Sequence, residues 1–172
     1  MQQDSVKSFT FTDSLFVIFL AASLIAVGYL GNLSYQEGLK TEAAKANAAK
    51  LKDWFDKLEE ISSKGEASPL EACQDDGEKT WEGCRAALIG EKGPLNGAKN
   101  PFDAVLPVIG AKCDRADLNT RGLVVVEKGT PAPPAMNFGP FEDSDTISKD
   151  LPLRIMVCDK GAYALKVAEV KL

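Results

Sequence analysis

The segment LFVIFLAASLIAVGYLGNL, residues 15–33, dominates any interpretation of this chain. It contains no charged side chain, and its few polar or small positions include Ser23, Gly28 and Asn32. A helix needs about 20 predominantly apolar residues to cross the hydrocarbon core of a bilayer, and this run is close to that length. Because the run also lacks a polar face, it predicts a membrane-spanning helix near the N-terminus.

Two other interpretations of the run stay open, a buried core helix and a cleaved secretory signal. A core helix would be shorter and would carry a polar face. A secretory signal would have a basic start and a small-x-small cleavage site. Residues 1–8 contain one Lys and one Asp, and the run ends in Tyr-Leu-Gly-Asn-Leu. These features favour a retained anchor.

The helical pattern continues after the apolar run but becomes amphipathic. Residues 34–63 are rich in Ala, Lys, Glu and Leu and contain no Pro. Lys64-Gly65 then supplies a helix stop, so we expect one helix from about Phe9 to about Ser63. Its apolar stripe is expected to pack on a sheet and consists of Tyr35, Leu39, Ala43, Ala46, Leu51, Trp54, Phe55, Leu58 and Ile61.

The remaining chain divides into a connecting region, residues 66–121, and a sheet region, residues 122–172. Pro and Gly punctuate the connecting region, in which a short helix is expected near residues 81–89. The predicted strands are 122–127, 151–158 and 162–172. The strand 151–158 has Leu153, Ile155 and Val157 on one face. The strand 162–172 has Tyr163, Leu165 and Val167 on one face. The fold class is therefore α+β, a long N-terminal helix packed on a small antiparallel sheet of three or four strands.

Two connections in the sheet region have specific expectations. Residues 130–140 contain four Pro and are expected to form a loop, because Pro cannot donate to a central strand ladder. Asp159-Lys160-Gly161 is expected to form a tight turn in which Gly161 takes a positive φ.

The four cysteines are Cys73, Cys84, Cys113 and Cys158. The chain has no His and no CxxC pair, so the spacing fits no zinc finger or ribbon. Two disulfides are the better account and imply an oxidising compartment, the alternative being four unpaired core cysteines in a cytosolic protein. Cys73 and Cys84 would close a small loop, and Cys113 would tether the start of the sheet to Cys158.

The charge pattern gives conflicting evidence on orientation. Only Lys7 precedes the apolar run, whereas Lys40, Lys45, Lys50 and Lys52 follow it, so the positive-inside rule does not favour an outside C-terminus. The predicted disulfides favour an outside C-terminus. The net charge of −5 offers no basic footprint for nucleic acid.

The sequence predicts neither an enzyme nor a cofactor. Without His there is no His-based triad or general base, and no Walker loop, dinucleotide fingerprint or G-x-S-x-G motif is present. The acidic groups Asp75, Asp76 and Glu78, and Glu142, Asp143 and Asp145, match no EF-hand spacing. They are expected to be solvated loops, so no metal ligands are predicted.

This organisation resembles that of type IV pilins and type II secretion pseudopilins. The residues that carry the resemblance are Lys7-Ser8-Phe9-Thr10-Phe11-Thr12-Asp13, similar to a prepilin cleavage motif, with Asn100-Pro101-Phe102 as a weaker match before the sheet. The resemblance implies that a prepilin peptidase cuts between Ser8 and Phe9. Phe9 would carry the new, usually methylated, amine, and Asp13 would pair with the amine of a neighbouring subunit.

The match has three differences from the family pattern: Ser8 stands where Gly is usual, Asp13 replaces Glu, and the apolar helix lacks the common proline. An ordinary acid at the start of a membrane helix is the other interpretation of Asp13. The resemblance implies a filament subunit in the bacterial inner membrane, with a periplasmic or extracellular C-terminal domain. Its partners would be copies of itself or other pilin-like subunits. The alternative is an uncleaved single-pass accessory subunit of a membrane complex.

Overall fold

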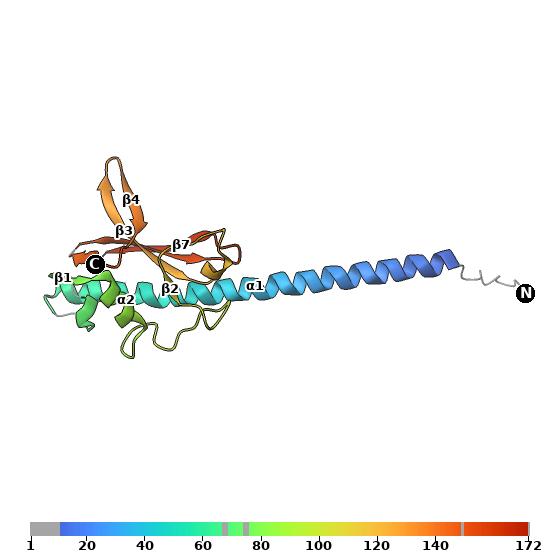
Figure 1. Ribbon diagram of the computed structural model, residues 1–172, viewed down its shortest axis with the longest axis horizontal. Helices are drawn as coiled ribbons and strands as arrows, with labels where there is room; N and C mark the ends of the chain where they lie inside the picture. Colours follow the sequence, from blue (N-terminus) through green and yellow to red (C-terminus); the bar gives the residue numbers. More distant parts are fainter. Residues whose placement is uncertain (1–10, 67–68, 74–75, 149, 172) are drawn as a thin grey trace, which may run out of the picture. The chain divides into compact units, whose positions relative to one another are not determined.

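The computed structural model describes residues 11–66, 69–73, 76–148 and 150–171. Its first element is the long helix α1, Phe11–Ser63, which confirms the predicted helix over the residues described (Figure 1). The chain forms two compact units, residues 1–37 and residues 38–172. Unit 1 contains the beginning of α1, and unit 2 contains the rest of α1 and all later elements.

The end of α1 forms as the Lys64-Gly65 sequence predicts. Gly65 has a φ of +73°, a left-handed conformation that glycine adopts without steric cost. The backbone N–H groups of Lys64 and Glu66 both donate to the carbonyl of Ile61, at 3.1 Å each. The last carbonyls of the helix are thereby partly satisfied, and the chain reverses toward the connecting region.

The main sheet of unit 2 has five strands rather than the three or four expected, and it is mixed rather than purely antiparallel. Its order is β2-β3-β6-β7, with β4 also paired to β3. β2 runs parallel to β3, and the other pairs are antiparallel. The strands are β2 (Ile109–Gly110), β3 (Val124–Ala132), β4 (Ala135–Pro140), β6 (Pro152–Cys158) and β7 (Ala164–Lys171).

A second, two-stranded sheet was not predicted. It pairs β1 (Asp76–Thr80) with β5 (Thr146–Ser148). Thr80 caps the short helix α2 (Trp81–Ile89), which has the bounds predicted for it. Two 3-10 helices, η1 (Glu71–Cys73) and η2 (Leu118–Thr120), complete the described elements.

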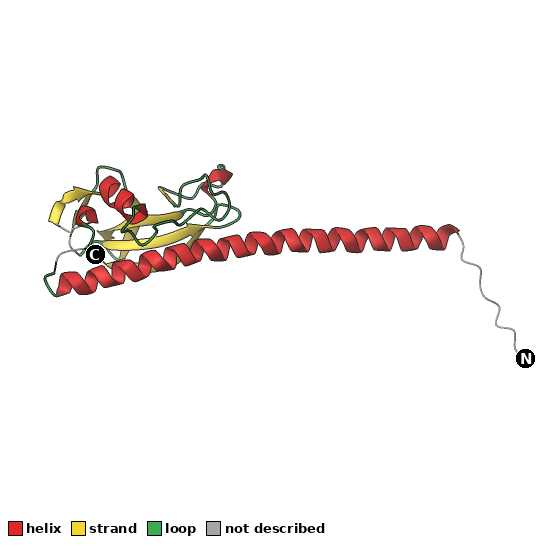
Figure 2. Ribbon diagram, turned by 90° about the horizontal axis from the view of Figure 1, so that it is seen from below, coloured by secondary structure: helices red, strands yellow, loops and turns green. Residues whose placement is uncertain are grey.

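The core of unit 2 lies between α1 and one face of the main sheet (Figure 2). The predicted face of β6 is confirmed, because Leu153, Ile155 and Val157 are fully buried in this cluster. Val124 and Val126 join it from β3, and Leu51 and Phe55 from α1. The opposite face of the sheet has a smaller cluster built from Leu123, Val125, Met156 and Cys158.

The buried stripe of α1 differs from the predicted one in its first half. Ala43 and Ala46 are exposed, and Tyr35 and Leu39 lie outside the core. The buried positions are instead Thr41, Ala44, Asn47, Ala48, Leu51, Phe55 and Leu58. Alanine occurs on several faces of this helix, so the alanine positions do not show which face is buried. The large side chains from Leu51 onward do show which face is buried.

The Pro-rich segment 130–140 is not a loop but the outer part of a β-hairpin (Figure 1). β3 pairs with β6 only over residues 124–128 and continues to Ala132 paired with β4 alone. Pro131 therefore lies in a region where β3 has one open edge. The prediction excluded Pro from a central strand, and this strand stops being central before Pro131 is reached.

The β6–β7 connection also differs from the expected turn. Ala162, not Gly161, has the positive φ, of 58°. Asp159 organises the turn, because its Oδ1 accepts from the backbone N–H groups of Gly161 at 2.8 Å and Tyr163 at 2.9 Å. Tyr163 thus belongs to the turn. Leu165 and Val167 pack against the core as predicted, and the register of β7 against β6 shifts between Lys166 and Ala168.

Candidate functional site

The surface of unit 1 is strongly apolar. From residue 15 to residue 33 every Leu, Ile, Val and Phe side chain is exposed. An 18-residue window of α1 reaches a mean hydropathy of 2.2 with none of it buried, so this helix is long and apolar enough to cross a membrane. Ser23 Oγ donates to the carbonyl of Phe19 at 2.8 Å, which satisfies this hydroxyl within the helix.

The predicted processing site, Ser8 and Phe9, lies outside the described residues. Asp13 is exposed in the first turn of α1, where a carboxylate interacts favourably with the positive end of the helix dipole. The apolar surface begins directly after it.

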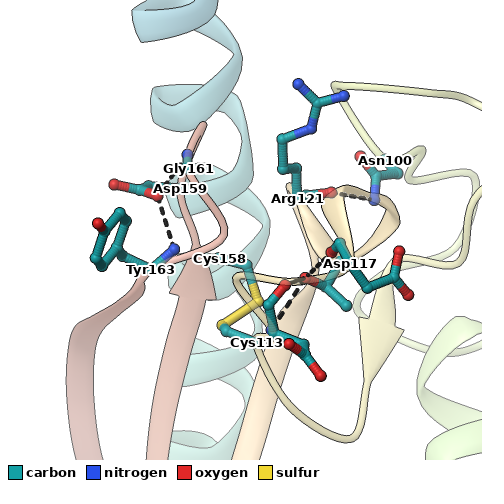
Figure 3. Close-up of a disulfide and its surroundings, with 10 residues drawn as sticks. Asn100, Cys113, Asp117, Arg121, Cys158, Asp159, Gly161 and Tyr163 are labelled. Carbon is teal, nitrogen blue, oxygen red and sulfur yellow. Dashed lines mark hydrogen bonds between the residues drawn. A yellow bond between two sulfur atoms is a disulfide. The ribbon is translucent and has the colours of Figure 1, made fainter.

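Both predicted cysteine pairs form disulfides. Cys73 bonds to Cys84, which joins η1 to α2, and Cys113 bonds to Cys158 at the end of β6 (Figure 3). No free cysteine remains. The Cα atoms are 4.6 Å and 5.4 Å apart, within the usual range for a disulfide. Such bonds persist in oxidising compartments, which is the environment that the cysteine count indicated.

The Asn100-Pro101-Phe102 segment forms a bend that is held by the buried side chain of Asn100. Asn100 is 2% exposed, and its Nδ2 donates to the carbonyls of Pro107 at 3.1 Å and Arg121 at 2.8 Å. Its Oδ1 accepts from the N–H of Phe102 at 3.0 Å. One side chain thereby joins the connecting region to the residues before β3.

Cationic side chains pack on aromatic rings at the same end of unit 2. Lys40 Nζ and the Arg121 guanidinium lie 5.7 Å and 5.4 Å from the centroid of the Phe102 ring. The Arg115 guanidinium lies 4.5 Å from the ring of Tyr163, beside the Cys113–Cys158 disulfide. These contacts stabilise the loops and leave the cations accessible to solvent.

Two of the three acids in residues 142–145 form ion pairs with other elements. Asp143 pairs with Arg85 of α2 at 3.0 Å, and Asp145 pairs with Lys128 of β3. Burial acts to raise the pKa of Asp145, but Lys128 and the hydrogen bond from the N–H of Glu142 outweigh it. The pKa of Asp145 therefore lies below its ordinary value of 3.8. These acids hold the β1–β5 region against its neighbours, which the expectation of a solvated loop missed.

Two further surface features of unit 2 were not predicted. The first is the outer part of the β3–β4 hairpin, residues 130–137, all of which are exposed. The second is a groove of about 690 Å³ between α2 and the segment that leads to β2, lined mainly by apolar side chains. One signal in the sequence points to the hairpin: residues 130–141 contain no charge, in a chain that is 26% charged.

Among the described residues, no group of three or more His, Cys, Asp or Glu side chains is placed to hold a metal ion. No family model, curated protein or solved structure matches this chain.

Proposed function

We propose that this protein is a subunit of a type IV pilus-like or type II secretion pseudopilus-like filament. The observation that supports the proposal is the exposed apolar surface of residues 15–33, on the same helix that contributes to the core of a small disulfide-bonded domain. A surface of this size is not stable in water. It requires lipid before assembly or neighbouring apolar helices after assembly.

Asp13 is the proposed register residue. A carboxylate moved into an apolar helix bundle without a partner costs several kcal/mol, and pairing with a cation greatly reduces that cost. The amine at Phe9 of a neighbouring subunit would supply the cation. The proposed orientation places unit 2 outside the cytoplasm, where its two disulfides are stable.

The mature N-terminus tests this proposal directly. Mass spectrometry of protein purified from its native membrane is expected to find a chain that begins at Phe9, with or without N-methylation. A functioning protein that retains Met1 would instead support the uncleaved accessory subunit.

A variant provides the second test. Asp13→Ala is expected to remain in the membrane fraction but to abolish assembled filaments, because the axial pairing is lost. Asp53→Ala, an exposed acid of the same helix within unit 2, is the matched control and is expected to assemble normally. Normal filaments from Asp13→Ala would remove Asp13 from the assembly mechanism.

A further inference from the structure

We propose that the outer hairpin of one copy docks into the apolar groove of the next copy. The outer hairpin is residues 130–137, and the groove lies between α2 and the segment 95–109. The contact would be head-to-tail, since a different surface is used on each copy. The inference rests on the proposed function and specifies how the extracytoplasmic domains meet.

The outer hairpin has the composition of a contact surface. Its residues, Thr-Pro-Ala-Pro-Pro-Ala-Met-Asn, are all exposed and uncharged. Met136, 44% exposed, supplies the largest apolar side chain. Beyond residue 128, β3 is no longer paired with β6, so both edges of this hairpin are open over the described strands. Open edges and an uncharged apolar tip are features that a monomeric protein usually avoids.

The groove matches the hairpin in polarity. Its walls include the exposed side chain of Ile89 on α2 and, on the facing segment, Leu106 and Pro107. The charged side chains that line it are Glu82 and Arg85, and Arg85 is already paired with Asp143. An uncharged hairpin can therefore enter without leaving Arg85 buried and unpaired.

The two surfaces belong to different copies because of where they lie. Figure 1 shows the β3–β4 hairpin projecting from one side of unit 2, with α2 on another side. β3 enters the hairpin from the main sheet, where it is paired with β6 along residues 124–128, and the hairpin therefore projects away from α2 of its own chain (Figure 1). A heterologous contact of this kind repeats from copy to copy and builds a ring or an open filament instead of a two-fold dimer.

The contact is too small to act alone. A stable interface usually engages about 20 to 30 residues on each side, and the outer hairpin has eight. The contact would therefore add to the association of the apolar helices, and it would select the partner and its register.

Cysteine crosslinking of the full-length protein in its membrane tests the inference. Met136→Cys and Ile89→Cys are produced as separate variants in the same cells, and disulfide-linked dimers are measured on non-reducing gels. A mixed dimer, in which the cysteine introduced at position 136 of one chain is linked to the cysteine introduced at position 89 of another, is expected from this pair. Leu118→Cys, a similarly exposed apolar position on η2 outside the groove, replaces Ile89→Cys as the control and is expected to give at least tenfold less dimer.

A charge on the hairpin provides a second measurement. Ala132→Glu in the Met136→Cys chain is expected to reduce the mixed dimer about tenfold, whereas Ala43→Glu, on the exposed face of α1, leaves it unchanged. Equal crosslinking of Met136→Cys to Ile89→Cys and to Leu118→Cys would overturn the inference. Filaments that assemble without the mixed dimer would overturn the inference and leave the proposed function intact. A mixed dimer in a chain that retains Met1 would support the contact and count against the proposed processing.

Discussion

The side-chain amide of Asn100 donates to the backbone carbonyl of Arg121 at 2.8 Å and joins two segments 21 residues apart. The same amide group donates to Pro107, and its oxygen accepts from Phe102. The loop after α2 is thereby held to Arg121, shortly before the start of β3. The segment between Asn100 and Arg121 contains Cys113, which forms a disulfide with Cys158. A buried side chain with three hydrogen bonds stabilises irregular backbone that has little apolar core of its own.

Asn100→Ala is therefore expected to lower the free energy of unfolding by about 2 to 3 kcal/mol, because the mutation leaves two carbonyls and one N–H without their partner. Thermal unfolding followed by circular dichroism is the measurement, with an expected fall in Tm of about 5 to 10 °C. Asn96→Ala is the matched control. Asn96 is exposed and donates one bond to Glu91, so its loss is expected to cost less than about 1 kcal/mol. Equal effects of the two variants would contradict the structural role of Asn100.

The corrected stripe of α1 gives a second prediction. Ala44 is fully buried against the sheet, and its neighbour Ala43 is exposed. Ala44→Leu overfills the core and is expected to destabilise the protein by about 1 to 3 kcal/mol. Ala43→Leu is expected to change stability by less than about 0.5 kcal/mol. Denaturant unfolding of the two variants distinguishes the faces, and the reverse order would restore the stripe that the sequence indicated.

The two disulfides are expected to contribute unequally. They close loops with sequence separations of 11 and 45 residues, for Cys73–Cys84 and Cys113–Cys158 respectively. In the chain-entropy model these loops contribute about 3 and about 4 kcal/mol. The double variants Cys73→Ala/Cys84→Ala and Cys113→Ala/Cys158→Ala are compared by their free energies of unfolding. A larger loss from the first pair would show that chain entropy is not the main term.

The Asp145 pair predicts a dependence of stability on pH. Because its pKa is lowered in the folded state, Asp145 contributes stability above its ordinary value of 3.8, and this contribution is lost as the pH falls through the lower, folded value. Asp145→Asn is expected to cost about 1 kcal/mol at pH 7. The difference in free energy of unfolding from the unmodified protein should disappear in strongly acidic solution.

Lys128→Met serves as the control background for this measurement. Without Lys128 the ion pair is absent, and only the hydrogen bond from Glu142 remains. The effect of Asp145→Asn at pH 7 is then expected to be roughly halved. The free energies of unfolding of Asp145→Asn and of the unmodified protein are compared at pH 7 and in acid. If they differ by the same amount at both pH values, the proposed role of the carboxylate is rejected.

Much of this fold follows from local pattern. The length of α1, its stop at Lys64-Gly65, the helix 81–89 and the inward face of β6 all depend on residues close together in the sequence. Hydrophobic periodicity and capping chemistry act over a few residues, so they are visible without a structure. The disulfides also join cysteines that are consecutive in the sequence, Cys73 with Cys84 and Cys113 with Cys158, as predicted.

The features that were missed depend on contacts between distant segments. β2, at two residues, exists because it pairs with β3, and β1 needs β5 nearly 70 residues later. Pro131 is accommodated because β6 ends its pairing with β3 before that point. The buried alanines of α1 are selected by where the sheet lies. The pattern of apolar side chains indicates which face each segment can bury. The packing of the whole domain decides which segments become neighbours. The groove and the outer hairpin are both products of that packing.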